Sequence, residues 1–236
     1  MNKKKDTSPK VHQNGKINEC LSVYQNQDLT LKQIELLKIL QDKHTKLVFI
    51  YGPAGTSKTY TSILAGLHLL NQKKVSNLIY VRSAVESSDS KLGFLPGEMD
   101  DKMSPYIQPL VDKLEELLPK GDIVKLKKED RILGIPVNFL RGLNWNAKCI
   151  IADECQNMTK KELITLITRV GEFSKLFICG DPDQSDINGK SGFTQIINSF
   201  DDQDSRDNGI FIFKFTEDDV VRSGLVKFIL KKLKTV

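Results

Sequence analysis

A chain of 236 residues is long enough to bury the core of one sizeable domain, and 39% hydrophobic residues with a formal charge of +5 are typical of a globular protein. No apolar run is long enough to cross a bilayer, and the start, MNKKKDTSPK, lacks the apolar stretch of a signal peptide. The sequence therefore predicts a cytoplasmic protein without a membrane partner. The mild basic excess permits nucleic-acid binding without establishing it.

The four cysteines do not indicate a metal site. None belongs to a C-x-x-C pair, and three of them lie in or beside apolar segments. Reduced thiols in a cytosol-like compartment are the expected state.

Helices and strands are predicted to alternate along the chain. Residues 1–28 are polar and are expected to form a flexible N-terminal arm, followed by one domain at 29–236. The predicted elements, in chain order, are a helix at 29–44, a strand at 46–51, a helix at 58–72, strands at 77–82, 131–137 and 147–153 with a helix at 101–120 between the first two, a helix at 159–170, a strand at 174–180, a helix at 191–200, a strand at 210–215 and a helix at 216–234.

The connections are also informative. Two internal prolines, Pro105 and Pro109, are expected to kink or divide the helix at 101–120, and the polar stretch at 201–209 to form a turn or excursion. Strands that alternate with helices indicate an α/β fold with a mainly parallel sheet and helices on both faces.

A glycine-rich loop stands between the first strand and the second helix. Its string GPAGTSKT lets successive backbone N–H groups surround phosphate oxygens at a helix N-terminus. Lys58 is predicted to reach the β- and γ-phosphates of ATP, and Thr59 to bind Mg²⁺. The residues predicted to bind the nucleotide here are Gly52, Pro53, Ala54, Gly55, Thr56, Ser57, Lys58, Thr59 and Tyr60.

One position departs from the phosphate-loop pattern, which places glycine directly before the lysine. The residue there is Ser57. A serine can adopt positive φ at a cost of about 1–2 kcal/mol. We therefore expect Ser57 to be a tolerated variant with its hydroxyl near the phosphates.

Further polar residues stand where nucleotide chemistry needs them. Asp153 is predicted to hold Mg²⁺, and Glu154 to activate the attacking water as a general base. Asp181 and Gln184 are expected to face the γ-phosphate. Arg222, in the final helix, is expected to neutralise charge as that phosphate leaves. The predicted catalytic residues are thus Glu154, Lys58, Gln184 and Arg222.

Each of these signals is weak alone, because acids commonly end strands and glycine-rich turns can be purely structural. In a parallel sheet, however, ligands bind beyond the carboxyl ends of the strands. The order of the motifs at those ends therefore predicts a nucleotide site.

The segments that carry these residues resemble the PhoH-like family of P-loop ATPases, relatives of the first core domain of superfamily 1 helicases. The resemblance covers residues 29–235 and includes AVESSDSKLGFLPGEMDDKMSPYIQPLVDKL, FLRGLNW, IIADECQNMTKKELITLITRVGEFSKLFICGDPDQSD and EDDVVRS. It implies a RecA-like P-loop NTPase fold and an ATP hydrolase that uses Mg²⁺. It also implies action on RNA or single-stranded DNA, with helicase activity as a hypothesis, and a homo-oligomer such as a hexameric ring.

Other residues take their predicted roles from this resemblance. Gln33 stands where related helicases read adenine; an exposed helix residue is the alternative. Arg82 is a candidate contact to nucleic acid or a solvated strand end, and the neighbouring Ser83 stands where the family has proline. Arg141 and Arg169 are candidates to reach into a neighbouring subunit's site, or else to form ordinary ion pairs.

Two rival functions remain. A regulatory or structural nucleotide-binding protein would share the site and hydrolyse ATP weakly. A small-molecule kinase of P-loop type is disfavoured, because DECQ together with GDPDQ is typical of γ-phosphate sensing in motor ATPases. The chain has no room for a second RecA-like domain, so a neighbouring subunit is expected to complete the site.

Overall fold

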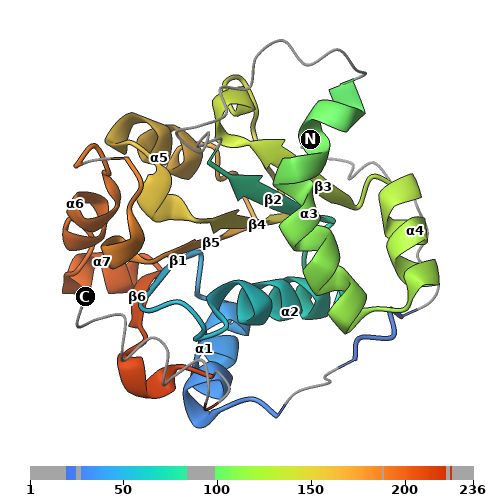
Figure 1. The fold of residues 1–236 in the computed structure, drawn as a ribbon, viewed down its shortest axis with the longest axis horizontal. Coiled ribbons are helices and arrows are strands. Elements are labelled where there is room, and N and C mark those ends of the chain that lie inside the picture. Colours follow the sequence, from blue (N-terminus) through green and yellow to red (C-terminus); the bar gives the residue numbers. More distant parts are fainter. Residues whose placement is uncertain (1–19, 25–27, 84–98, 188, 222–223, 225–236) are drawn as a thin grey trace, which may run out of the picture.

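Figure 1 shows the fold of the computed structural model, which describes residues 20–24, 28–83, 99–187, 189–221 and 224. Most of the predicted N-terminal arm lies outside these ranges. Its residues 20–24 are held against the domain: the Leu21 backbone exchanges hydrogen bonds with the Asn71 side chain, and the Tyr24 N–H donates to the Leu117 carbonyl oxygen at 2.8 Å. This part of the predicted arm is attached rather than loose.

The six predicted strands are all present, and they form one sheet. They are β1 (Leu47–Tyr51), β2 (Asn77–Arg82), β3 (Ile132–Pro136), β4 (Lys148–Asp153), β5 (Lys175–Gly180) and β6 (Ile210–Lys214). Every neighbouring pair is parallel, in the order β3-β2-β4-β5-β1-β6. The carboxyl ends of β4, β5 and β1 therefore lie side by side.

Helices cover both faces of this sheet (Figure 1). None of those in the described part of the chain combines the length and apolar character that a membrane span requires. The α-helices are α1 (Leu31–Gln41), α2 (Lys58–Asn71), α3 (Met99–Leu117), α4 (Lys120–Lys128), α5 (Lys160–Ile167), α6 (Phe193–Asn198) and α7 (Gln203–Asp207).

Alternate side chains of each strand pack on opposite faces. On one face, Val48 and Ile50 of β1 belong to a buried cluster with residues of α1, α2, α3 and α4. On the other face, Leu47 and Phe49 belong to a second cluster with residues of α5 and α6. This period of two, with both sets buried, is what a parallel sheet covered on both sides requires. The predicted α/β architecture is confirmed.

Some helical segments differ from the prediction. α3 is not divided at Pro109, because Leu110 and Leu114 on its apolar face are fully buried and offset the lost hydrogen bond. The helix α4, which follows it, was not predicted. The stretch 201–209, predicted as a turn, contains α7. The Asp202 side chain starts this short helix by accepting from the Ser205 N–H at 2.7 Å.

The predicted helix at 216–234 is wrong at its start. The chain makes one 3₁₀ turn, Glu217–Asp219, and then becomes extended at Val220, whose φ and ψ are −70° and 116°. An extended residue cannot continue the i→i+4 hydrogen bonds of a helix. Apart from residues 221 and 224, the rest of that prediction lies outside the described residues.

Candidate functional site

The glycine-rich loop joins β1 to α2 at the carboxyl edge of the sheet. Gly52 has a φ of 141°, and a Cβ there would come within 2.4 Å of the Phe215 carbonyl oxygen. Gly55 has a φ of 86°. Only glycine adopts such angles freely, so both positions require it. The loop then delivers the chain to the first turn of α2, whose backbone N–H groups lack intrahelical partners.

Ser57 occupies the left-handed region, with φ 63° and ψ 32°. The loop therefore does need positive φ at the position where its pattern has glycine. The Ser57 carbonyl oxygen starts α2 by accepting from the Thr61 N–H at 2.9 Å. The Ser57 side chain makes no capping hydrogen bond, which leaves the first turn of α2 available to an anion.

Lys58 is folded onto the loop that precedes it. Its Nζ donates to the carbonyl oxygens of Gly52 at 2.7 Å and Pro53 at 2.9 Å. Burial lowers the pKa of Lys58, and the nearby carboxylates of Asp181 and Asp153 oppose that shift. The result is a half-buried cation in the pocket.

Both carboxylate oxygens of Asp153 accept hydrogen bonds. Thr59 Oγ1 donates to Oδ1 at 2.8 Å, and the Tyr80 hydroxyl donates to Oδ2 at 2.6 Å. Burial and the neighbouring carboxylate raise the pKa of Tyr80, so its hydroxyl keeps its proton. The predicted pair of Thr59 and Asp153 is thus in contact. Tyr80 was not predicted; the only available signal is a tyrosine inside the aliphatic run NLIYVR.

Glu154 is held by a buried glutamine. The residue has a φ of 53°, and its Oε2 accepts from Gln156 Nε2 at 2.6 Å. Gln156, 1% exposed, also accepts from the Asp181 N–H at 3.0 Å through its Oε1. Asp181 in turn accepts from Gln184 Nε2 at 2.8 Å. One hydrogen-bonded chain therefore links the ends of β4 and β5, and Gln156 is its unpredicted member.

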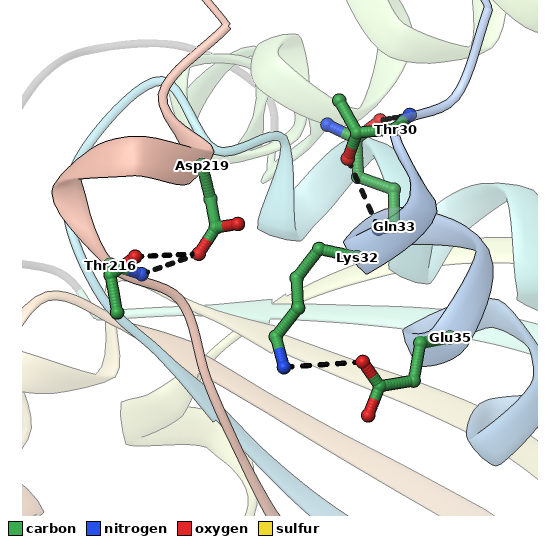
Figure 2. A network of polar contacts seen from close by, with 6 residues as sticks. All are labelled: Thr30, Lys32, Gln33, Glu35, Thr216 and Asp219. Carbon is green, nitrogen blue, oxygen red and sulfur yellow. Dashed lines mark hydrogen bonds and ion pairs between the residues drawn. The ribbon is translucent and has the colours of Figure 1, made fainter.

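Gln33 is buried, with 3% of its surface exposed, so the interpretation as an exposed helix residue is wrong. Its Oε1 accepts from the Thr30 N–H in the capping box of α1, shown in Figure 2. Its Nε2 donates to the Thr56 carbonyl oxygen of the loop at 3.2 Å. Gln33 thus ties α1 to the phosphate loop, and adenine recognition stays a prediction.

The segment after β6 also reaches the loop. A second capping box, Thr216 with Asp219, fixes its 3₁₀ turn opposite the start of α1 (Figure 2). The Val221 N–H then donates to the Gly55 carbonyl oxygen at 2.8 Å. Arg222, the next residue, lies outside the described residues, so its role stays a prediction.

The loop and the polar residues at the ends of β4 and β5 surround one pocket of about 390 Å³. Two of its lining residues, Lys113 and Glu116, come from α3 and were not predicted; their ion pair measures 2.5 Å. The Tyr60 hydroxyl is buried and has no partner among the described residues. The lining is Ala54, Gly55, Ser57, Lys58, Thr59, Tyr60, Lys113, Glu116, Asp153, Glu154, Gly180, Asp181, Gln184 and Val221.

Comparison with known proteins agrees with this geometry. A family model described as PhoH-like protein matches residues 26–234. The chain belongs to the PhoH-like family.

PhoH-like relatives occur in several bacteria. Those of Mycobacterium tuberculosis and Bacillus subtilis are 38% and 36% identical over 186 and 194 residues, which is 78% and 80% of this chain and 51% and 58% of the relatives. Protein PhoH of Escherichia coli is 30% identical over 197 residues, 82% of this chain and 54% of that protein. The chain spans about half the length of the curated relatives it matches.

Solved structures share the fold of this PhoH-like chain. The large terminase of bacteriophage D6E in complex with ADP has a TM-score of 0.52 at 12% identity, covering 86% of this chain and 50% of that one. The Sulfolobus solfataricus SWI2/SNF2 ATPase core in complex with dsDNA has a TM-score of 0.51 at 15% identity, with 86% and 48% covered. The chain has the fold of a RecA-like P-loop ATPase core.

The remaining predicted arginines do not line the pocket. Arg82 ends β2 and pairs in register with Asp153. Arg169 Nη1 donates to the Leu143 carbonyl oxygen at 3.4 Å, whereas Arg141 is exposed. Their roles with nucleic acid or a neighbouring subunit stay predictions.

Proposed function

We propose that this chain binds ATP with Mg²⁺ and hydrolyses it. The observation that carries the proposal is the convergence of Lys58, Thr59, Asp153 and Glu154 on one pocket at the carboxyl edge of the sheet. The pocket falls in the size range of small-molecule sites, and parallel sheets bind ligands at this edge. Membership of the PhoH-like family supports the same conclusion.

The donor atoms in the pocket suit Mg²⁺. Thr59 Oγ1 and Asp153 Oδ1 are hard oxygen ligands of the kind this ion prefers, and they lie 2.8 Å apart. These two residues would hold the ion, which when bound neutralises charge on the β- and γ-phosphates. Lys58 would exchange the carbonyl oxygens of Gly52 and Pro53 for phosphate oxygens, while the first turn of α2 binds phosphate through its N–H groups.

Glu154 is the proposed general base. Because Gln156 fixes Oε2, we assign to Oε1 the proton that leaves the attacking water. Gln184, oriented by Asp181, would face the γ-phosphate from the end of β5. Arg222 is proposed to neutralise charge as that phosphate leaves.

We further propose that hydrolysis is coupled to RNA or single-stranded DNA in a homo-oligomeric ring. The family and the net charge of +5 support this coupling. Arg82 is the proposed contact to the strand. Since Arg169 is bound within its own chain, Arg141 is the better candidate to complete a neighbouring subunit's site.

A matched pair of variants tests the ATPase proposal. Glu154→Gln keeps the size of the side chain and removes the base, so phosphate release should fall by about 10²-fold or more while ATP binding persists. Glu172→Gln, at an exposed position outside the pocket, should hydrolyse ATP like the wild type. Equal rates for wild type and Glu154→Gln would refute the proposal.

The same assay separates the rival functions. A kinase would transfer phosphate to an added acceptor instead of releasing it. A regulatory nucleotide-binding protein would bind ATP without turnover above that of Glu154→Gln. RNA and single-stranded DNA should stimulate phosphate release. The mass of the protein in solution shows whether it forms the proposed homo-oligomeric ring. A strand-displacement assay that shows hydrolysis without unwinding would exclude helicase activity.

A further inference from the structure

The Tyr80 phenol is a buried donor to the aspartate that is proposed to bind Mg²⁺. Tyr80 is 1% exposed, and its hydroxyl lies 2.6 Å from Asp153 Oδ2. We propose that Tyr80 positions Asp153 as a one-oxygen ligand and thereby makes the site select Mg²⁺ over Ca²⁺. This inference rests on the proposed function of the same site.

Sheet register explains why a tyrosine performs this task. β2 and β4 are neighbours, with Tyr80 opposite Ile151 and Arg82 opposite Asp153. Tyr80 and Ile151 both belong to the cluster on the α2 side of the sheet, so Tyr80 points to the face that carries Thr59. Two residues along a strand span about 6.6 Å. A tyrosine side chain covers that distance, whereas the shorter hydroxyl side chains of serine and threonine do not.

The two hydrogen bonds give the two oxygens of the Asp153 carboxylate different roles. Thr59 Oγ1 donates to Oδ1 and both residues line the pocket, so we place the cation beside Oδ1. Tyr80 engages Oδ2 and fixes the rotation of the carboxylate. With Oδ2 bound to the phenol, binding of one ion through both oxygens of Asp153 is disfavoured.

Mg²⁺ and Ca²⁺ differ in how many oxygens of one carboxylate they coordinate. Mg²⁺ is small, keeps several waters and takes one oxygen from each carboxylate in an octahedral shell. Ca²⁺ is larger and readily accepts both oxygens of a carboxylate. A carboxylate fixed by Tyr80 therefore suits Mg²⁺, and one released from Tyr80 gains a binding mode that suits Ca²⁺.

Nucleotide binding without turnover tests this directly. The affinity for the non-hydrolysable analogue β,γ-imido-ATP is measured calorimetrically with Mg²⁺ and, separately, with Ca²⁺. Tyr80→Phe, which keeps the ring and removes the hydroxyl, should weaken binding with Mg²⁺ by about 10-fold or more, the usual range for a lost partner of a metal ligand. Binding with Ca²⁺ should change by less than about 3-fold, so the preference for Mg²⁺ narrows.

Two further variants show whether Tyr80 acts through Asp153. The double variant Asp153→Asn with Tyr80→Phe should bind the analogue as Asp153→Asn alone does, with Mg²⁺ and with Ca²⁺. Tyr24→Phe, which removes an exposed hydroxyl, should bind the analogue like the wild type with either ion. Urea unfolding in EDTA checks that Tyr80→Phe is folded; if it is not, Tyr80→Met fills the space without a donor and is measured in the same way.

The outcomes are distinguishable. If the wild type binds the analogue and Tyr80→Phe leaves the ratio of the two affinities unchanged, the role of Tyr80 in selection is refuted and the proposed function stands. If the wild type does not bind the analogue with Mg²⁺, the proposed function itself fails.

Discussion

Gln156 Nε2 donates to Glu154 Oε2 at 2.6 Å, and this contact is made by a side chain that is almost fully buried between the ends of β4 and β5. The other end of the same amide accepts from the Asp181 backbone. A buried amide with both ends engaged has little freedom to rotate. Glu154 is consequently oriented, through Gln156, by the backbone of Asp181 directly after β5.

The first prediction concerns this contact. Gln156→Met keeps the length of the side chain and removes both hydrogen bonds, so Glu154 loses its orientation. We expect kcat for ATP hydrolysis to fall by about 10–100-fold with KM changed little, because ground-state binding is untouched. Gln195→Met, on an exposed position of α6, is the matched control and should leave kcat unchanged. A rise in KM at constant kcat would contradict the positioning role.

The second prediction concerns the strain at Ser57. Ser57→Gly removes a left-handed serine, which costs about 1–2 kcal/mol, and adds glycine's entropy in the unfolded chain, which costs about 0.5–1 kcal/mol. Urea unfolding should therefore show a gain of about 0.5–1 kcal/mol, and ATP should bind equally or more tightly. Lys73→Gly, at another left-handed position outside the pocket, should give a similar gain without any effect on binding. Loss of ATP binding in Ser57→Gly would make the serine an active participant.

The third prediction concerns Gly52. Gly52→Ala places a Cβ within 2.4 Å of the Phe215 carbonyl oxygen at a φ of 141°, so the loop and the residue that follows β6 must separate. We expect a loss of about 2 kcal/mol or more in the free energy of unfolding, together with weaker ATP binding. Gly121→Ala in α4 meets no atom within 4 Å and should instead gain up to about 1 kcal/mol. Equal unfolding midpoints for the two variants would contradict the prediction, because they would show that the loop accommodates the added Cβ without loss of stability.

The fourth prediction concerns pH. Burial lowers the pKa of Lys175 to about 8, while its Nζ donates to the carbonyl oxygens of Asp42 and Thr45. The unfolded chain keeps this proton up to its ordinary pKa of 10.5, so between these values it binds more protons than the native state. Stability contributed by Lys175 therefore rises with pH from about 8 to 10.5.

Comparison of two variants isolates that contribution. Relative to Lys175→Met, the wild type should gain free energy of unfolding over this pH window in urea titrations. Lys43→Met, at an exposed position, should have a free energy of unfolding that changes with pH in the same way as that of the wild type. A difference between wild type and Lys175→Met that stays constant with pH would place the pKa of Lys175 outside the window.

The strands and the polar residues at their ends were predictable because both depend on local pattern. Apolar runs that stop at glycine, proline or acid mark the ends of β1, β4 and β5, and parallel pairing brings those ends to one edge. Lys58, Thr59, Asp153 and Glu154 could therefore be assigned to one site before their distances were known. The turn at Ser57 followed from the same local pattern.

Tyr80 and Gln156 could not be predicted, because their roles depend on which strands are neighbours. β2 lies beside β4, although β3 separates them in sequence, and this adjacency puts Tyr80 near Asp153. Gln156 needs β5 beside β4 to reach Asp181. Sequence periodicity gives the face of a strand and not its partner. Gln33 was placed near the nucleotide only by the family resemblance, because helical periodicity alone is equally consistent with a surface position; its burial depends on the packing of α1 on the loop.

The hydrogen bond from the Val221 N–H to the Gly55 carbonyl oxygen has a consequence for synthesis of the protein. β1 leaves the ribosome early in synthesis. Its neighbour in the sheet, β6, ends only at residue 214, and the residue that contacts Gly55 lies further along the chain, at 221. A growing chain therefore cannot make this contact to the loop until residue 221 has been translated. The lining of the pocket, which includes Val221, is complete only from that point of synthesis onward.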